Sequence, residues 1–156
     1  MVDHLGVEPR PSPVASVPAQ EGGRDAAQVW ALRGAAVLMW IAGFGFGVFD
    51  VFPMWSLSHG GGVPTVLGFP VYGGGPFETS GIPTTIPLLV VFLVICVGQI
   101  VAGFLVWNRR RTGALLALLF LIAGAAFWLG FALPVGQVLG VLWAALIAFG
   151  WTALRS

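Results

Sequence analysis

Long apolar stretches dominate the chain after residue 28. From Val29 to Phe52 the only charged residues are Arg33 and Asp50, and residues 86–107 contain none. A helix rises 1.5 Å per residue, so a stretch of about 20 apolar residues crosses a hydrocarbon core of about 30 Å. Each of these two stretches therefore predicts one membrane-spanning helix, over 29–52 and 86–107.

The last apolar stretch predicts two further spans. Residues 113–154 carry no ionisable group, and as one helix these 42 residues would be roughly 63 Å long, twice the apolar thickness of a bilayer. Pro134 and Gly136 favour a reversal between them, because proline breaks a helix and glycine permits a tight turn. We therefore expect spans over 113–132 and 136–154, and an all-α membrane protein built as a four-helix transmembrane bundle.

The segments outside the spans differ in character. Residues 1–28 hold four prolines and mixed charge, which predicts a disordered cytoplasmic tail, and their lack of an early apolar run predicts no secretory signal. The four-span domain would then cover 29–155. Residues 53–85 form a long Gly/Pro-rich outer loop with eight glycines and five prolines. Its large apolar residues lead us to expect a cap that folds back over the outer ends of the spans, close to Asp50.

Composition and charge support this arrangement. The chain is 58% hydrophobic and 8% charged, whereas soluble domains carry roughly 25% charged residues. In a four-span topology all seven arginines fall on one side, which predicts that both termini are cytoplasmic and that the protein lies in the cell membrane. Arg109, Arg110 and Arg111 would fix the topology and meet anionic lipid headgroups. We expect the lipid bilayer as a partner, and no nucleic acid.

Small and polar residues within the spans predict helix contacts. A ridge spaced by four residues comprises Gly136, Gly140, Ala144 and Ala148, and span 29–52 has Gly43 and Gly47 at the same spacing. Such ridges let helices approach closely. Two alternatives stay open for the first ridge, namely packing within the chain and a seam with a second copy or another membrane protein. Gln99 is expected to bond a carbonyl or hydroxyl group of a neighbouring helix.

Few residues offer chemistry. Asp50, His59 and Glu78 are the only ionisable groups near the outer side, their spacing matches no catalytic or metal motif, and the lone Cys96 excludes a disulfide within the chain. We expect Asp50 to face the bundle with the glycines, to reach headgroup water and to accept from Thr84 or Thr85. A speculative ligand site would combine Asp50, His59, Tyr72 and Glu78. No catalytic residue, metal or cofactor is predicted.

Three functions fit these observations. The leading interpretation is a non-enzymatic membrane protein that acts as a scaffold or accessory subunit, or that binds a lipid or small apolar ligand beneath the outer loop. The alternative is an oligomeric transporter or channel component for a small solute, with a pathway around Asp50 and Gln99. The third is a membrane enzyme that uses Asp50, His59 and Glu78. Convergence of these three side chains on one cavity would favour the enzyme, and a continuous polar lumen would favour transport.

Overall fold

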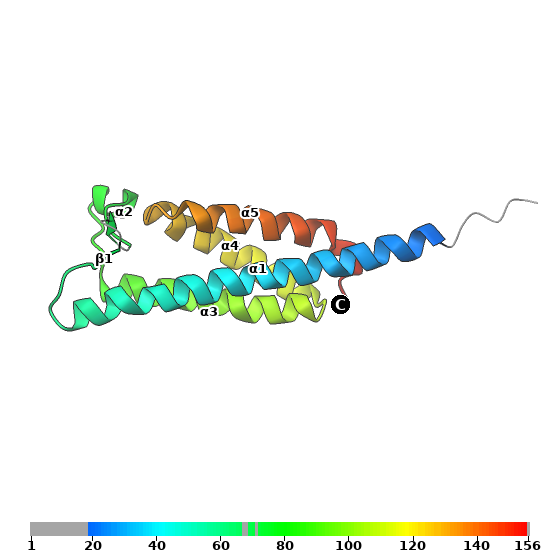
Figure 1. Cartoon of the computed structure of the whole chain (residues 1–156), viewed down its shortest axis with the longest axis horizontal. Helices are drawn as coiled ribbons and strands as arrows, with labels where there is room; N and C mark the ends of the chain where they lie inside the picture. The colour runs from blue at the N-terminus through cyan, green and yellow to red at the C-terminus, as the bar shows by residue number, and fades with distance from the viewer. Residues whose placement is uncertain (1–18, 67–68, 71, 156) are drawn as a thin grey trace, which may run out of the picture.

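Four long helices lie side by side in the computed structural model, which describes residues 19–66, 69–70 and 72–155 (Figure 1). The helices are α1 (Ala19–Ser58), α3 (Ile86–Trp107), α4 (Arg111–Gly130) and α5 (Pro134–Phe149). Three of them, α1 from Gly22 onward, α3 and α4, are long and apolar enough to cross a membrane, whereas α5 has 16 residues. The chain is therefore a helical protein suited to a membrane.

Short elements complete the fold. Residues between α1 and α3 contain an antiparallel pair of two-residue strands, β1 (Thr65–Val66) and β2 (Phe69–Pro70), and one helical turn, α2 (Pro76–Thr79). A 3₁₀ turn, η1 (Trp151–Ala153), follows α5.

Helix α1 is longer at both ends than the expected span 29–52. It begins at Ala19, so the prediction of a disordered tail is wrong for residues 19–28, while residues 1–18 lie outside the described part of the chain. Residues 19–28 include alanine, glutamine, glutamate and arginine, which favour helix. At the other end α1 continues through the buried Pro53 to Ser58. One proline removes a single amide donor, a loss that apolar helices tolerate when neighbouring helices pack around them.

The boundary of α3 was predicted correctly, whereas α4 and α5 differ from the expected spans. Helix α3 covers the same residues as the predicted span 86–107, with proline in its first turn. Helix α4 ends at Gly130 rather than at residue 132, and α5 ends at Phe149, five residues before the predicted end, where the 3₁₀ turn follows. Both helices begin two residues earlier than expected, and Pro134 is the first residue of α5 rather than part of the turn. A proline at this position has the backbone angle that a helix needs and lacks an amide that would be unsatisfied there. The reversal is made instead by residues 131–133, with Ala132 at φ +56°.

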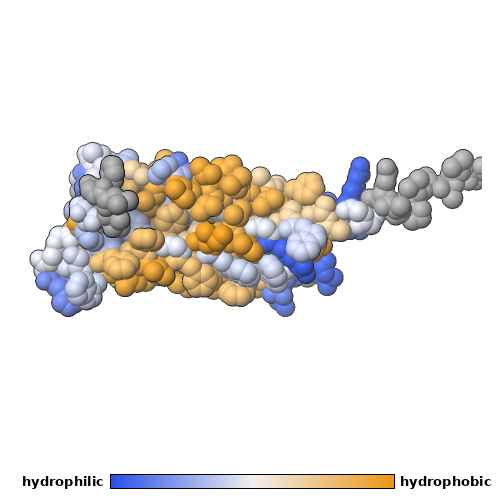
Figure 2. Space-filling view, viewed as in Figure 1, coloured by the Kyte–Doolittle hydropathy of each residue, from blue (hydrophilic) through white to orange (hydrophobic). Residues whose placement is uncertain are grey.

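Two clusters of buried side chains hold the helices together. One, towards the end where α5 finishes, is built on Leu32, Met39 and Trp143, and the other, towards the loop, is built on Phe92 and Trp128. Large apolar side chains also cover the outside of the helices, and Figure 2 shows this surface as an orange band between more hydrophilic ends. An exposed apolar surface of this extent is unfavourable in water and suits the hydrocarbon core of a membrane.

The predicted ridge on α5 meets α4 over only part of its length. A Cβ atom added at Gly136 would lie 2.5 Å from Cγ of Trp128, and one added at Gly140 would lie 2.8 Å from Cζ3 of the same indole. The two glycines therefore make room for the Trp128 ring. Further along the ridge, Ala144 is half-buried and Ala148 is exposed.

Candidate functional site

Asp50 is the one acid within the helical bundle among the described residues, and it is fully buried. Neither of its carboxylate oxygens has a hydrogen-bond partner among the described residues. The expectations that Asp50 reaches headgroup water and accepts from Thr84 or Thr85 are therefore wrong. Thr84 instead donates to the carbonyl of Tyr72 at 2.6 Å, and Thr85 makes no side-chain cap on α3. A buried carboxyl group without a partner is costly, which makes Asp50 the leading functional candidate.

We call residues 72–84 the cap. Its first residue, Tyr72, lies over helix α1. The side chain of Tyr72 is 2% exposed, and its hydroxyl donates to the carbonyl of Phe46 at 2.9 Å, one helical turn before Asp50. Tyr72 has a φ of +59°, an uncommon conformation for a residue with a side chain. The carboxylate of Glu78 accepts from the amide of Gly74 at 2.7 Å. These bonds fix the turn of chain that presents Tyr72.

Aromatic side chains dock the cap on the helix ends. Phe77 packs edge-on against Phe131, with ring centroids 5.3 Å apart, and its ring occupies the space that a side chain at Gly130 would fill. Tyr72 makes similar edge contacts with Phe92 and Phe131. The expected docking of the loop is thus present at Tyr72 and Phe77, while Leu67, Gly68 and Val71 lie outside the described residues.

The environment of Tyr72 gives a direct test of the cap. Burial raises the pKa of its hydroxyl above the ordinary value of 10.0, and charge on Asp50 and Cys96 raises it further. A raised folded-state pKa means that Tyr72 stabilises the fold fully below pH 10 and that this contribution is lost as the pH rises above that value. Tyr72 is the only tyrosine in the chain, so its titration is unambiguous.

We therefore expect no tyrosinate absorbance near 295 nm as the folded protein is titrated to pH 11, whereas the denatured protein should titrate with a pKa of about 10. The pH-stability curve of the protein should fall above pH 10. Titration of the folded protein near pH 10 would show that Tyr72 is in water and that the cap is undocked.

The other proposed ligand residues do not join Asp50 in one cluster. His59 is exposed, and its Nδ1 atom lies 2.9 Å from the carbonyl of Trp55 and 3.1 Å from the hydroxyl of Ser58. Glu78 is connected to Tyr72 through Thr84. The Thr84 hydroxyl lies 3.4 Å from the Glu78 carboxylate and donates to the carbonyl of Tyr72. Across residues 19–66, 69–70 and 72–155, no three His, Cys, Asp or Glu side chains are placed to hold a metal ion.

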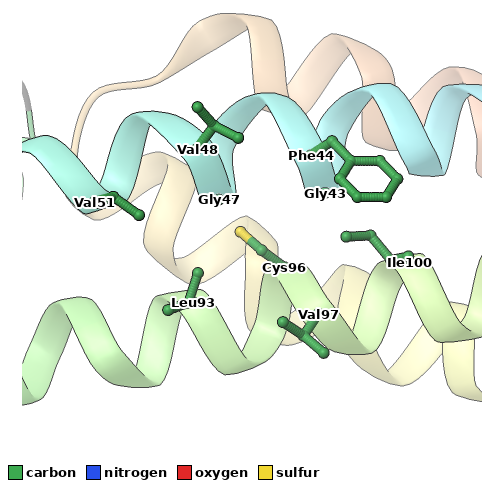
Figure 3. A pocket seen from close by; sticks show the side chains of 9 residues that line it. All are labelled: Gly43, Phe44, Gly47, Val48, Val51, Leu93, Cys96, Val97 and Ile100. Carbon is green, nitrogen blue, oxygen red and sulfur yellow. The ribbon is translucent and has the colours of Figure 1, made fainter.

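An apolar groove lies between α1 and α3, and Figure 3 shows it from close by. Its volume is about 230 Å³. Gly47 and Cys96 form its floor, and exposed side chains such as Val51 and Val97 form its walls, so the groove opens sideways towards lipid. The lining residues are Gly43, Phe44, Gly47, Val48, Val51, Leu93, Cys96, Val97 and Ile100.

The two glycines of α1 have different roles in the groove. A Cβ atom at Gly43 would lie 2.8 Å from the carbonyl oxygen of Cys96, so the backbones of α1 and α3 are in close contact there. A Cβ atom at Gly47 would lie 3.6 Å from the Cβ of Cys96, which is ordinary contact. The spacing of the two glycines predicts helix packing at both positions and does not predict the groove. The absence of a side chain at Gly47 leaves the space that forms it.

Gln99 lies at the contact between α3 and α4. Its side chain is 1% exposed, and its amide nitrogen fills the space next to Gly124, 2.9 Å from where a Cβ atom would lie. The expected bond from this nitrogen to a neighbouring helix is absent among the described residues. The buried indole nitrogen of Trp143 likewise has no hydrogen-bond partner among them. The close contact with Gly124 places Gln99 inside the bundle rather than towards lipid.

No family model, curated protein or solved structure matches this chain at a significant level.

Proposed function

We propose that the chain is a four-span membrane protein with both termini on the cytoplasmic side. The arginines support this topology, because those in the described residues gather at one end of the bundle. Arg155 bonds through its backbone to the 109–111 segment, and the guanidinium of Arg33 lies 5.3 Å from the ring centroids of both Trp30 and Trp107. Tryptophan and arginine together are typical of the cytoplasmic interface. Helix α5 is about 24 Å long, and the η1 turn extends it towards the same interface.

We further propose that the protein is a non-enzymatic binder of a lipid acyl chain or a similarly apolar ligand, held in the α1–α3 groove. The single observation that carries this proposal is the groove itself, whose nine lining residues include no charged side chain and which opens to the lateral surface. Association in lipid depends on close van der Waals contact, which a groove offers to a flexible chain and a flat helix surface does not. The aromatic packing beneath the cap favours this location over one under the loop.

The test fills the groove without disturbing the helices. Gly47→Leu adds a side chain where only ordinary contacts exist, and Gly45→Leu is the matched control, because Gly45 is exposed and has nothing within 4 Å of an added Cβ atom. In proteoliposomes a photoreactive fatty acid should crosslink to α3 residues such as Leu93 and Val97. We expect Gly47→Leu to reduce this labelling at least fivefold and Gly45→Leu to leave it unchanged. Equal labelling of both variants would refute a specific site.

A second candidate function is an oligomeric transporter of a small solute. The unpartnered polar atoms of Asp50 and Gln99 favour it, because buried polar groups in a membrane often mark a pathway. The enzyme hypothesis receives less support, since His59 is bonded locally at the surface while Asp50 is buried.

A further inference from the structure

The end of the bundle opposite the cap brings together arginines from distant parts of the sequence. After α3, Arg109 adopts a φ of +58°, and Arg110 precedes α4 in an extended conformation. The C-terminal segment then pairs with this turn as a parallel bridge between Arg110 and Arg155. The amide of Arg155 donates to the carbonyl of Arg109 at 2.6 Å, and the amide of Arg111 donates to the carbonyl of Arg155 at 2.9 Å.

The hydrogen bonds of this turn among the described residues are made by backbone groups and by the Asn108 amide, and none of them uses a guanidinium group. The Arg110 amide donates to Leu105, and the Asn108 side chain donates to the carbonyl of Phe104 at 2.8 Å. Leu154, which is 5% exposed and packs in the core, anchors the segment that carries Arg155. The surrounding backbone bonds also hold Arg109 at its uncommon positive φ, a feature often found at binding sites.

A recess lies between these groups. Its volume is about 790 Å³, and its lining combines Leu105 and Asn108 with Arg110 and Arg155, both of which are exposed. Among the residues whose side chains the structure describes, positive charge predominates at this end. Asp50 is buried and Glu78 belongs to the cap, so Asp25 on α1 is the one other described acid.

We infer that Arg110 and Arg155 bind the phosphate group of an anionic phospholipid. Guanidinium groups bind phosphate oxygens in pairs of hydrogen bonds, and the backbone pairing of Arg110 with Arg155 brings two such groups to one recess. The recess also has an apolar wall at Leu105, and the half-exposed Trp107 ring lies at the end of α3, at the depth of lipid headgroups. Phospholipid therefore fits better than free phosphate, which has no apolar part.

This site goes beyond the proposed acyl-chain groove and uses none of its residues. It rests only on the proposed placement of the arginine end at the cytoplasmic face, where anionic lipids attract basic residues. If the groove experiment fails, the proposed phosphate site is unaffected. If the experiment on the phosphate site fails, the proposed groove is unaffected.

A double-mutant cycle on lipid binding tests the inference. The full chain in mild detergent is titrated with phosphatidylglycerol or phosphatidylcholine, and bound lipid is counted by native mass spectrometry. The variants are Arg110→Gln, Arg155→Gln and the pair, and Arg24→Gln is the matched control because Arg24 is an exposed arginine on α1 that does not line the recess.

We expect each single variant to weaken phosphatidylglycerol binding about tenfold and Arg24→Gln to weaken it less than threefold. The double variant should lose clearly less than the product of the two single losses, because both arginines act on one phosphate. Additive losses, or an equal loss in Arg24→Gln, would show diffuse attraction and overturn the site. Displacement of the lipid by 10 mM inorganic phosphate, used as roughly a physiological level, would overturn the choice of phospholipid as ligand. An unchanged melting temperature in both single variants confirms that they fold.

Discussion

Replacing Gly140 by Leu is expected to lower the free energy of unfolding by about 3 kcal/mol. A Cβ atom at this position would lie 2.8 Å from both Trp128 and Leu121. The half-buried Leu121 can move, but the Trp128 ring is buried and is also in close contact with Gly136. The added side chain must therefore push α5 away from α4. Unfolding of the protein in mixed micelles of increasing denaturing detergent measures the change.

Ala148→Leu is the matched control on the same ridge of α5. Ala148 is exposed, so a leucine there meets lipid and the stability should change by less than about 0.5 kcal/mol. This variant also separates the two interpretations of the ridge. If Ala148→Leu changes the oligomeric state, the part of the ridge around Ala148 is a seam between copies. If Gly140→Leu leaves stability unchanged, the packing of Trp128 on α5 described above is wrong.

Replacing Asp50 by Asn is expected to raise the free energy of unfolding by about 2 kcal/mol at neutral pH. The carboxyl group is fully buried and its oxygens have no partner among the described residues, so a neutral side chain of nearly the same size removes the cost of burying a charge. A stabilising substitution at a buried polar residue is typical of a position kept for function rather than for stability. The same detergent unfolding assay applies.

Glu78→Gln is the control for this prediction, because Glu78 is a carboxylate with partners. It accepts from the amide of Gly74, so its replacement should lower stability by about 1 kcal/mol. A loss of stability in Asp50→Asn would show that the Asp50 carboxylate has a favourable partner in the membrane. If the protein is a transporter, Asp50→Asn should abolish solute flux in proteoliposomes although it stabilises the fold.

Apolar length and arginine placement were the informative parts of the sequence for the fold. The boundaries of α3 could be read directly, because threonines and a proline precede an unbroken apolar run and asparagine with three arginines follows it. Helix α1 was harder to delimit. Pro53 predicts that the helix ends at residue 52, and the composition of residues 19–28 predicts a tail. A local pattern shows neither the packing that keeps a proline within a helix nor the continuation of the helix beyond the apolar run.

The features of the candidate site could not be predicted from local sequence patterns. Gly43 and Gly47 lie four residues apart on α1, yet the first is in close contact with the backbone of α3, whereas the second makes only ordinary contacts and lines the groove. Tyr72 carried no motif, and its position above α1 follows from a positive φ and from aromatic contacts made across the chain.

Composition and the length of the apolar stretches predict apolar helices suited to a membrane, because the hydrophobic effect depends on these two properties and not on which residues are neighbours. They do not predict that Asp50 is buried with no partner among the described residues, that Trp128 packs on the glycines of α5, or that Arg110 pairs with Arg155. Each of these depends on contacts between residues distant in the chain, and such contacts are set by how helices pack against one another.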